Sequence, residues 1–248
     1  MEYLNFGKKG GERFVILPGL SLKSVMGSAD AIVSAYSVIA EDYDVYLFDH
    51  IKEEPLGYSV ENMAEDTLAA FKELGIEKAN IMGVSMGGMI AQAIALIDPG
   101  AVKCLVLCST SSKGSGSAVL DIWRELAEKK EAKELSRSFG EYVYTPSFYE
   151  QYKEIIDNMG EGASGLDFEN FIISIDAIKS FDVSERLGDI KCPVFVIGAG
   201  EDRVLGAGSS YDLMDGLGCE GYIYEGKGHG VYDEEPDYLK RVKEDALR

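Results

Sequence analysis

Between residues 79 and 109, short runs that are apolar throughout alternate with a helical pattern, with almost no spacer between them. ANIMGVS reads as a strand, MGGMIAQAIALI as a helix and AVKCLVLCS as a second strand. Strands that are apolar at every residue are typical of a parallel sheet that helices cover on both faces. This stretch therefore predicts an α/β fold built on a mostly parallel, doubly wound sheet.

The N-terminal part of the chain extends the same alternation. YLNF, the turn GKKGG and RFVILPG predict a strand, a tight hairpin connection and a second strand. Residues 29–39 follow with apolar side chains at helical spacing. A strand at 44–50 leads to a helix that begins after the N-cap Ser59 and stops at Gly75.

The alternation breaks after residue 109 and resumes near residue 193. SSKGSGS (111–117) is a hinge of small residues, and the pattern beyond it is helical to about residue 190. Amphipathic helices are expected over 119–127 and 168–178, with an aromatic-rich segment at 139–152 between them.

The C-terminal part returns to the first pattern, with a strand at 193–200, a helix at 209–217, a strand GYIYEG and a last helix from Asp237. We therefore predict a core domain of residues 1–110 and 182–248, interrupted by a helical insertion of residues 111–181.

Charge and hydropathy limit the partners of this chain. Its 24 basic and 43 acidic residues give a net charge of −19, which repels nucleic-acid phosphates and anionic membrane faces. No window approaches the roughly 18 consecutive apolar residues of a membrane span, and the N-terminus lacks the apolar core of a signal peptide. We expect a cytoplasmic protein that binds a small-molecule substrate, with no nucleic acid and no membrane as partner; a homodimer is left open.

The cysteines indicate neither a disulfide framework nor a metal site. Cys104, Cys108, Cys192 and Cys219 form no CxxC pair and no cluster with histidine at metal-ligand spacing. Cys104 and Cys108 stand four apart on one predicted strand, so both face the same side. We expect buried, reduced thiols and no need for a metal or an organic cofactor.

The pentapeptide GVSMG (83–87) contains the first candidate for chemistry. It fits G-x-S-x-G, and an apolar strand ends at it while a helix begins directly after it, which is the context that makes this motif a nucleophile elbow. The glycines let strand and helix approach closely and hold the serine in a strained, exposed conformation. Ser85 is therefore the candidate nucleophile.

A serine hydroxyl needs a base beside it and an acid that orients the base. Of the two histidines, His229 lies in a glycine-flanked loop after the last strand, whereas His50 precedes the serine. The order nucleophile, acid, histidine then nominates Asp202, which follows the strand at 193–200. Glu201 is a weaker candidate, because only one of two adjacent side chains can reach the imidazole. The end of the preceding strand, at 109–111, is the other position from which an acid could act, and it has no carboxylate.

An oxyanion needs backbone N–H donors that are already in place. Met86, directly after the serine, supplies one, and Leu20 in the segment LPGL supplies the second, with Ser21 as the neighbouring alternative.

Over essentially its whole length, the chain resembles the α/β-hydrolase superfamily. The resemblance rests on these residues and on the segments LPG, GVSMGG, FDVSERLGDIKCPVFVIGAGED and GKGHGVYDEEPDYL. It is similar to the small, lid-bearing members: esterases, lactonases, haloperoxidase-like enzymes and carbon–carbon bond hydrolases. The resemblance implies an α/β-hydrolase fold in which the insertion is a helical cap over the site. The usual His-Gly of the oxyanion loop is Pro18-Gly19 here, and the usual Asp-x-Arg-Gly-x-Gly is replaced from Asp49 onward by DHIK.

The sequence thus predicts a serine hydrolase that cleaves a small ester, thioester or lactone through an acyl-enzyme. Carbon–carbon bond hydrolysis or acyl transfer with the same three residues, and a non-catalytic ligand-binding member of the fold, are the alternatives. His50, Trp123 and Tyr144 are candidate substrate contacts. If aromatic residues of the cap face inward, the substrate has an apolar acyl or aromatic part.

Overall fold

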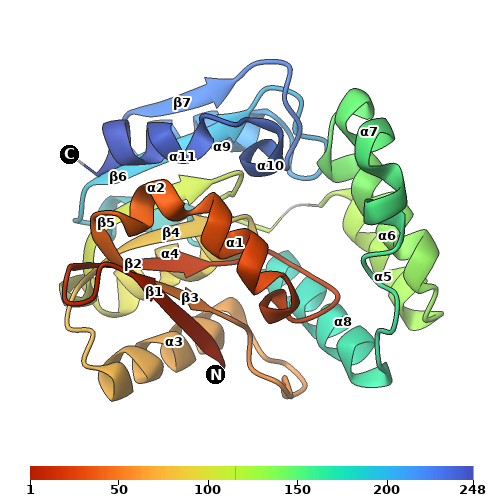
Figure 1. The fold of residues 1–248 in the computed structure, drawn as a ribbon, viewed down its shortest axis with the longest axis horizontal. Helices are drawn as coiled ribbons and strands as arrows, with labels where there is room; N and C mark the ends of the chain where they lie inside the picture. The colour runs from red at the N-terminus through yellow and green to blue at the C-terminus, as the bar shows by residue number, and fades with distance from the viewer. Residues whose placement is uncertain (115, 248) are drawn as a thin grey trace.

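The computed structural model describes residues 1–114 and 116–247 and contains one seven-stranded sheet in the order β1-β3-β2-β4-β5-β6-β7 (Figure 1). Every neighbouring pair is parallel except β1 and β3, which are antiparallel. The predicted mostly parallel, doubly wound sheet is therefore confirmed. The strands are β1 (Tyr3–Gly7), β2 (Glu12–Leu17), β3 (Tyr43–Phe48), β4 (Ala79–Val84), β5 (Val102–Cys108), β6 (Val194–Ala199) and β7 (Gly221–Tyr224).

The predicted hairpin between the first two strands is wrong. β1 and β2 are both strands, but β3 lies between them and pairs with each. The buried carboxylate of Asp44 on β3 explains this choice, because it accepts hydrogen bonds from the Asn5 side chain, the Gly10 N–H and the Arg13 guanidinium. The turn residues thus cross the end of β3 instead of closing a two-stranded ribbon.

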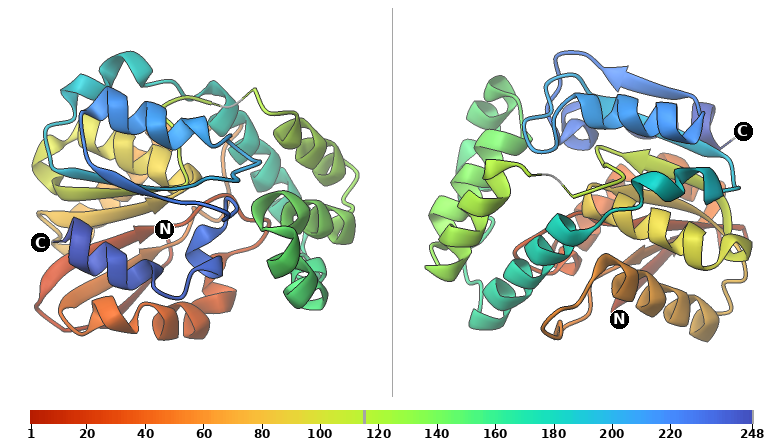
Figure 2. Two further views of the ribbon diagram at one scale, coloured as in Figure 1. Left: turned by 90° about the horizontal axis from the view of Figure 1, so that it is seen from above. Right: turned by 180° about the vertical axis from the view of Figure 1, so that it is seen from behind.

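Helices cover both faces of the sheet (Figure 2). Alternate residues along a strand belong to the cores on its two sides. Ile81 of β4 joins the core under one set of helices, and its neighbour Met82 joins the core under the other. The helices outside residues 111–181 are α1 (Ala29–Ala35), α2 (Ser37–Ala40), α3 (Val60–Leu74), α4 (Met86–Ile97), α9 (Gly208–Leu217), α10 (Val231–Glu234) and α11 (Tyr238–Arg241), with 3-10 turns at Val25–Ser28, Pro99–Ala101 and Ser184–Asp189 and a π turn at Val242–Ala246.

Local signals in the sequence account for the ends of these helices. Ser59 and Asn62 form a capping box at the start of α3, and Gly75 ends the helix in a left-handed conformation, as predicted. The predicted helix over 29–39 is interrupted at Tyr36, whose ψ of 9° leaves the helical range and separates α1 from α2.

Between β5 and β6 the chain forms α5 (Ala118–Glu128), α6 (Ala132–Val143), α7 (Pro146–Asp157) and α8 (Gly165–Ser180). These helices lie at one end of the sheet (Figures 1 and 2). The aromatic-rich segment at 139–152 is helical apart from the short turn between α6 and α7. The two connections to the core run side by side, through the bridge of Lys113 with Asp182. Ser115, part of the predicted hinge, lies outside the described residues. No helix within residues 1–114 and 116–247 has both the length and the hydrophobicity of a membrane-spanning segment.

Candidate active site

Ser85 occupies a sharp turn between β4 and α4. Its φ of 52° lies in the left-handed region that a side chain rarely adopts, so the backbone is strained here. The Ser85 N–H donates to the carbonyl of Cys108 at 2.8 Å, and its own carbonyl accepts the Thr110 hydroxyl at 2.7 Å. At Gly87 a Cβ would collide with the backbone of Leu17, so only glycine allows this approach. Neighbouring strands therefore hold the strained turn in place.

The structure brings Ser85, His229 and Asp202 together. The Nε2 atom of His229 lies 3.0 Å from the Ser85 Oγ, and its Nδ1 atom lies 2.8 Å from Oδ2 of Asp202. His229 is buried and Ser85 half-buried. Because a carboxylate accepts hydrogen bonds, it favours the tautomer with the proton on Nδ1 and leaves Nε2 free to accept the serine proton. This arrangement can perform general base and nucleophilic chemistry.

Backbone amides of its own loop hold the Asp202 carboxylate in place. Oδ1 of Asp202 accepts the N–H groups of Val204 at 2.8 Å and Leu205 at 2.9 Å. Burial tends to raise the pKa of Asp202, but His229 and these two amides outweigh burial and lower it. The carboxyl therefore stays ionised. Of the two adjacent acids it is Asp202 that reaches the imidazole, while Glu201 is exposed.

The candidate oxyanion donors lie next to the serine. Gly19 packs on Ser85 so closely that an added Cβ would lie 3.2 Å from the serine Cβ. Leu20 lines the same small cavity as Ser85 and His229. In the part of the chain that the structure describes, the N–H groups of Leu20 and Met86 make no hydrogen bond, so both are free to bind an oxyanion.

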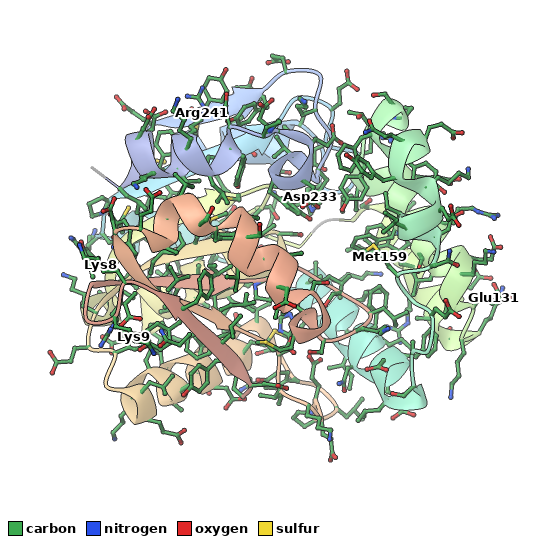
Figure 3. The ribbon with its side chains drawn as sticks, in the orientation of Figure 1. Lys8, Lys9, Glu131, Met159, Asp233 and Arg241 are labelled. Carbon is green, nitrogen blue, oxygen red and sulfur yellow. The ribbon has the colours of Figure 1, made fainter. Side chains whose placement is uncertain are left out.

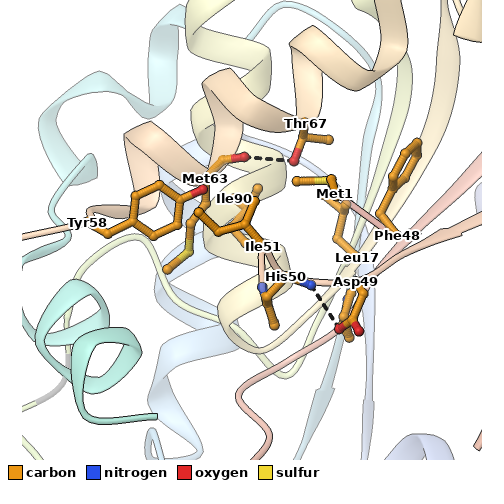
Figure 4. A pocket seen from close by; sticks show the side chains of 11 residues that line it. Met1, Leu17, Phe48, Asp49, His50, Ile51, Tyr58, Met63, Thr67 and Ile90 are labelled. Carbon is orange, nitrogen blue, oxygen red and sulfur yellow. Dashed lines mark hydrogen bonds between the residues drawn. The ribbon is translucent and has the colours of Figure 1, made fainter. Parts of the chain in front are cut away.

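His50 is not brought into this cavity. The Nε2 atom of its ring lies 3.4 Å from the carbonyl oxygen of Gly19, and its backbone N–H donates to the Asp49 carboxylate at 2.9 Å. The ring lines a separate pocket of only about 10 Å³, together with residues such as Tyr58 and Met63 (Figure 4). Burial lowers the pKa of His50, so the ring is neutral near pH 7.

Two cavities meet at the candidate site. The smaller, of about 30 Å³, lies beside Ser85 and His229 and includes Trp123, which stacks on Phe139 at a centroid distance of 4.6 Å. The larger is a cleft of about 730 Å³, lined by residues of α1, the 18–28 loop, α6, α8, α10 and α11, among others. Gly19, Leu20, Phe139 and Tyr232 line both. Trp123 therefore belongs to the small cavity and Tyr144 to the large cleft.

The turn between α6 and α7 is hydrogen-bonded to the loops that carry Asp202 and His229, a connection that was not predicted from the sequence. The Val143 carbonyl accepts the Gly230 N–H at 2.8 Å, and the Tyr144 carbonyl accepts the Arg203 guanidinium at 2.7 Å. Glu234 binds Thr145 through both carboxylate oxygens. Glu234 belongs to an acidic run after His229, and this run was the only signal in the sequence for the Thr145 contact. Among the described residues, no three His, Cys, Asp or Glu side chains are grouped so as to hold a metal ion.

Proteins of known family and structure share this architecture. A family model described as the alpha/beta hydrolase fold matches residues 13–236. RutD from Agrobacterium fabrum, to which carbamate hydrolysis is provisionally ascribed, is 27% identical over 89% of this chain and 89% of its own length. The 2-hydroxy-6-oxononadienedioate/2-hydroxy-6-oxononatrienedioate hydrolase of Paraburkholderia xenovorans is 29% identical over 99% of this chain and 90% of its own. An enol-lactonase crystal structure from Burkholderia xenovorans LB400 matches with a TM-score of 0.85, over 98% of this chain and 94% of that one, at 20% identity.

Proposed function

The chain belongs to the alpha/beta hydrolase fold family, and we propose that it is a serine hydrolase that cleaves small esters, thioesters or lactones through an acyl-enzyme. The observation that carries this proposal is the continuous hydrogen-bond chain from Ser85 through His229 to Asp202. A triad is identified by such geometry and not by sequence position.

In the proposed reaction, the Ser85 oxygen attacks the substrate carbonyl carbon while Nε2 of His229 takes the serine proton. The N–H groups of Leu20 and Met86 stabilise the negative charge that develops on the carbonyl oxygen. The imidazolium, stabilised by ionised Asp202, then donates its proton to the departing oxygen or sulfur, and the carbonyl reforms as an acyl ester on Ser85. Water, deprotonated by His229, attacks this ester, and the serine regains its proton as the acid leaves.

We assign residues 111–181 to a cap that shapes the substrate pocket. Trp123 and Phe139 of this segment line the small cavity beside Ser85, and Tyr144 and Met159 line the cleft. Most side chains along both cavities are apolar or aromatic, so the substrate has an apolar or aromatic portion.

Carbon–carbon bond hydrolysis is the second candidate, because the relative in Paraburkholderia is named a hydrolase of 2-hydroxy-6-oxononadienedioate. That substrate is a dicarboxylate, and two carboxylates need cationic partners when they are enclosed. The charged residues that line the cleft in the described chain are Lys23 and Asp233, one of each sign. Ester, thioester or lactone hydrolysis is therefore favoured.

A fluorophosphonate probe tests the proposal. We expect stoichiometric labelling of the wild type, loss of labelling in Ser85→Ala, and full labelling of Ser180→Ala, which removes an exposed hydroxyl at the end of α8. p-Nitrophenyl esters of increasing acyl length, beside thioesters and lactones, then define the bond that is cleaved. A folded wild-type protein that is neither labelled nor active on these substrates would identify a ligand-binding member of the fold.

A further inference from the structure

Asp233 presents a carboxylate to the large cleft that the reaction described above does not use. It lies on α10, four residues after His229, and lines the cleft together with Tyr144 and Tyr232. Figure 3 labels Asp233 beside α10 and Met159 on the cap, two of the residues that line this cleft. Asp233 is exposed, and its exposed surface lines the cleft.

One oxygen of this carboxylate is already bound and the other is free. The Tyr144 hydroxyl donates to Oδ2 at 2.8 Å and fixes the orientation of the carboxyl group. Oδ1 has no hydrogen-bond partner among the described residues. Partial desolvation in the cleft raises the pKa of Asp233, and the hydrogen bond from Tyr144 opposes the rise. A cation bound at Oδ1 would offset this desolvation.

The other charged residue of the cleft, Lys23, forms no ion pair with Asp233 among the described residues. The Lys23 ammonium donates to the carbonyl of Glu161 at 2.8 Å, where the 21–24 loop meets the segment between α7 and α8. The remaining lining residues of the described chain are uncharged, and most are apolar. The cleft therefore offers one accessible negative charge within apolar walls, in a protein whose net charge of −19 attracts cations from solution.

The reaction geometry indicates which half of a substrate would reach Asp233. His229 must protonate the departing oxygen, so the alcohol portion lies on the side of the imidazole. The same loop continues through Tyr232, which lines both cavities, to Asp233 in the cleft. The small cavity, of about 30 Å³, has room for little more than a short acyl group.

We propose that Asp233 is a specificity-determining residue that selects esters with a short acyl group and an apolar alcohol portion ending in a cationic amine. This inference rests on the proposed serine hydrolase function. The protonated amine donates a charge-assisted hydrogen bond to the free carboxylate oxygen, and its alkyl chain lies against the apolar walls.

The test compares two isosteric substrates, 3-(dimethylamino)propyl acetate and the uncharged 4-methylpentyl acetate, by pH-stat titration at pH 7. We expect kcat/KM of the wild type to favour the cationic ester by roughly tenfold or more. In Asp233→Asn the ratio falls to about one, while Asp212→Asn, which removes an equal charge from the exposed face of α9, keeps the wild-type ratio.

A second pair places the amine in the acyl half: ethyl 4-(dimethylamino)butanoate and ethyl 5-methylhexanoate. We expect no cationic preference with this pair. A preference confined to the acyl pair overturns the placement of the alcohol portion, and a wild-type ratio near one, or an unchanged ratio in Asp233→Asn, overturns the role of Asp233. These outcomes all require turnover of esters, so they are distinct from failure of the proposed function, in which no ester is cleaved and Ser85 is not labelled.

Discussion

The carboxylate of Glu234 holds Thr145 with both oxygens: Oε1 accepts the backbone N–H at 2.6 Å and Oε2 accepts the hydroxyl at 2.9 Å. The two residues are 89 positions apart, and Glu234 follows the loop of His229. Glu234→Ala leaves the Thr145 N–H unpaired, so we expect a loss of about 2 kcal/mol in the free energy of unfolding and a lower kcat. Urea unfolding and ester turnover measure these changes. Thr145→Val, which keeps the backbone bond, serves as the milder comparison; equal stability of all three proteins contradicts the prediction.

Asp202→Asn tests the orientation of the imidazole. An amide at this position can donate to Nδ1 and favour the tautomer that cannot accept the serine proton, so kcat falls by about 10³–10⁴-fold with little change in KM. Steady-state kinetics with a p-nitrophenyl ester provide the measurement. Glu201→Gln, at the exposed neighbouring acid, keeps the wild-type kcat. A comparable loss in both variants would argue against a specific role for Asp202.

The strain at Ser85 predicts a difference between two inactive variants. Both Ser85→Ala and Ser85→Gly lack the nucleophile and lose several orders of magnitude in kcat. Only glycine adopts a φ of 52° without a steric penalty, so Ser85→Gly is more stable than Ser85→Ala by about 1 kcal/mol. Thermal unfolding compares the two. A less stable glycine variant would show that the turn is not strained.

Gly19→Ala tests the oxyanion loop. The new Cβ would lie 3.2 Å from the Ser85 Cβ and 3.3 Å from the Val84 carbonyl oxygen, so the loop that carries the Leu20 N–H must shift. We expect kcat to fall by about tenfold to a hundredfold with a small change in KM. Gly188→Ala, where a Cβ meets no atom within 4 Å, is the matched control. Unchanged kcat in Gly19→Ala would place the second donor elsewhere.

Glu54 makes stability depend on pH. Burial raises its pKa to about 7, although the Ser174 hydroxyl of α8 donates to its carboxyl oxygens and opposes the rise. The folded protein therefore retains a proton that the unfolded chain has lost, and this stabilisation is complete below about pH 4.5 and disappears as the pH rises through 7. The contribution is on the order of 3 kcal/mol.

Urea unfolding between pH 5 and 8 measures this effect. We expect the free energy of unfolding of the wild type to fall with rising pH relative to Glu54→Gln, which stays neutral throughout. Glu53→Gln, at the exposed neighbour, keeps the wild-type slope. Parallel curves for the wild type and Glu54→Gln would show that Glu54 has an ordinary pKa in the folded protein.

The features that could be predicted from the sequence are those encoded by local signals and by strand order. Ser59 and Gly75 delimit α3 because capping is local. Ser85, Asp202 and His229 converge because parallel strands present their carboxyl ends at one edge of the sheet.

The features that could not be predicted depend on long-range packing. The turn at 7–11 looks like a hairpin, but the choice of β3 as partner depends on Asp44, more than thirty residues away. The placement of His50 in a pocket separate from Ser85 follows from how separate elements pack together, and so does the contact between Glu234 and Thr145. No periodic pattern in the sequence predicts either of these features.

The fastening of the Val143–Thr145 turn to the loops of Asp202 and His229 also bears on how substrates arrive. Rotation of the helical segment away from the sheet would have to break the hydrogen bonds of this turn with Gly230, Arg203 and Glu234, next to His229 and Asp202. We therefore expect substrates of the proposed hydrolase to enter through the cleft of about 730 Å³ while this turn stays in place. On this basis, turnover by the proposed hydrolase is expected to be limited by chemistry or by product escape, and not by opening of the helical segment.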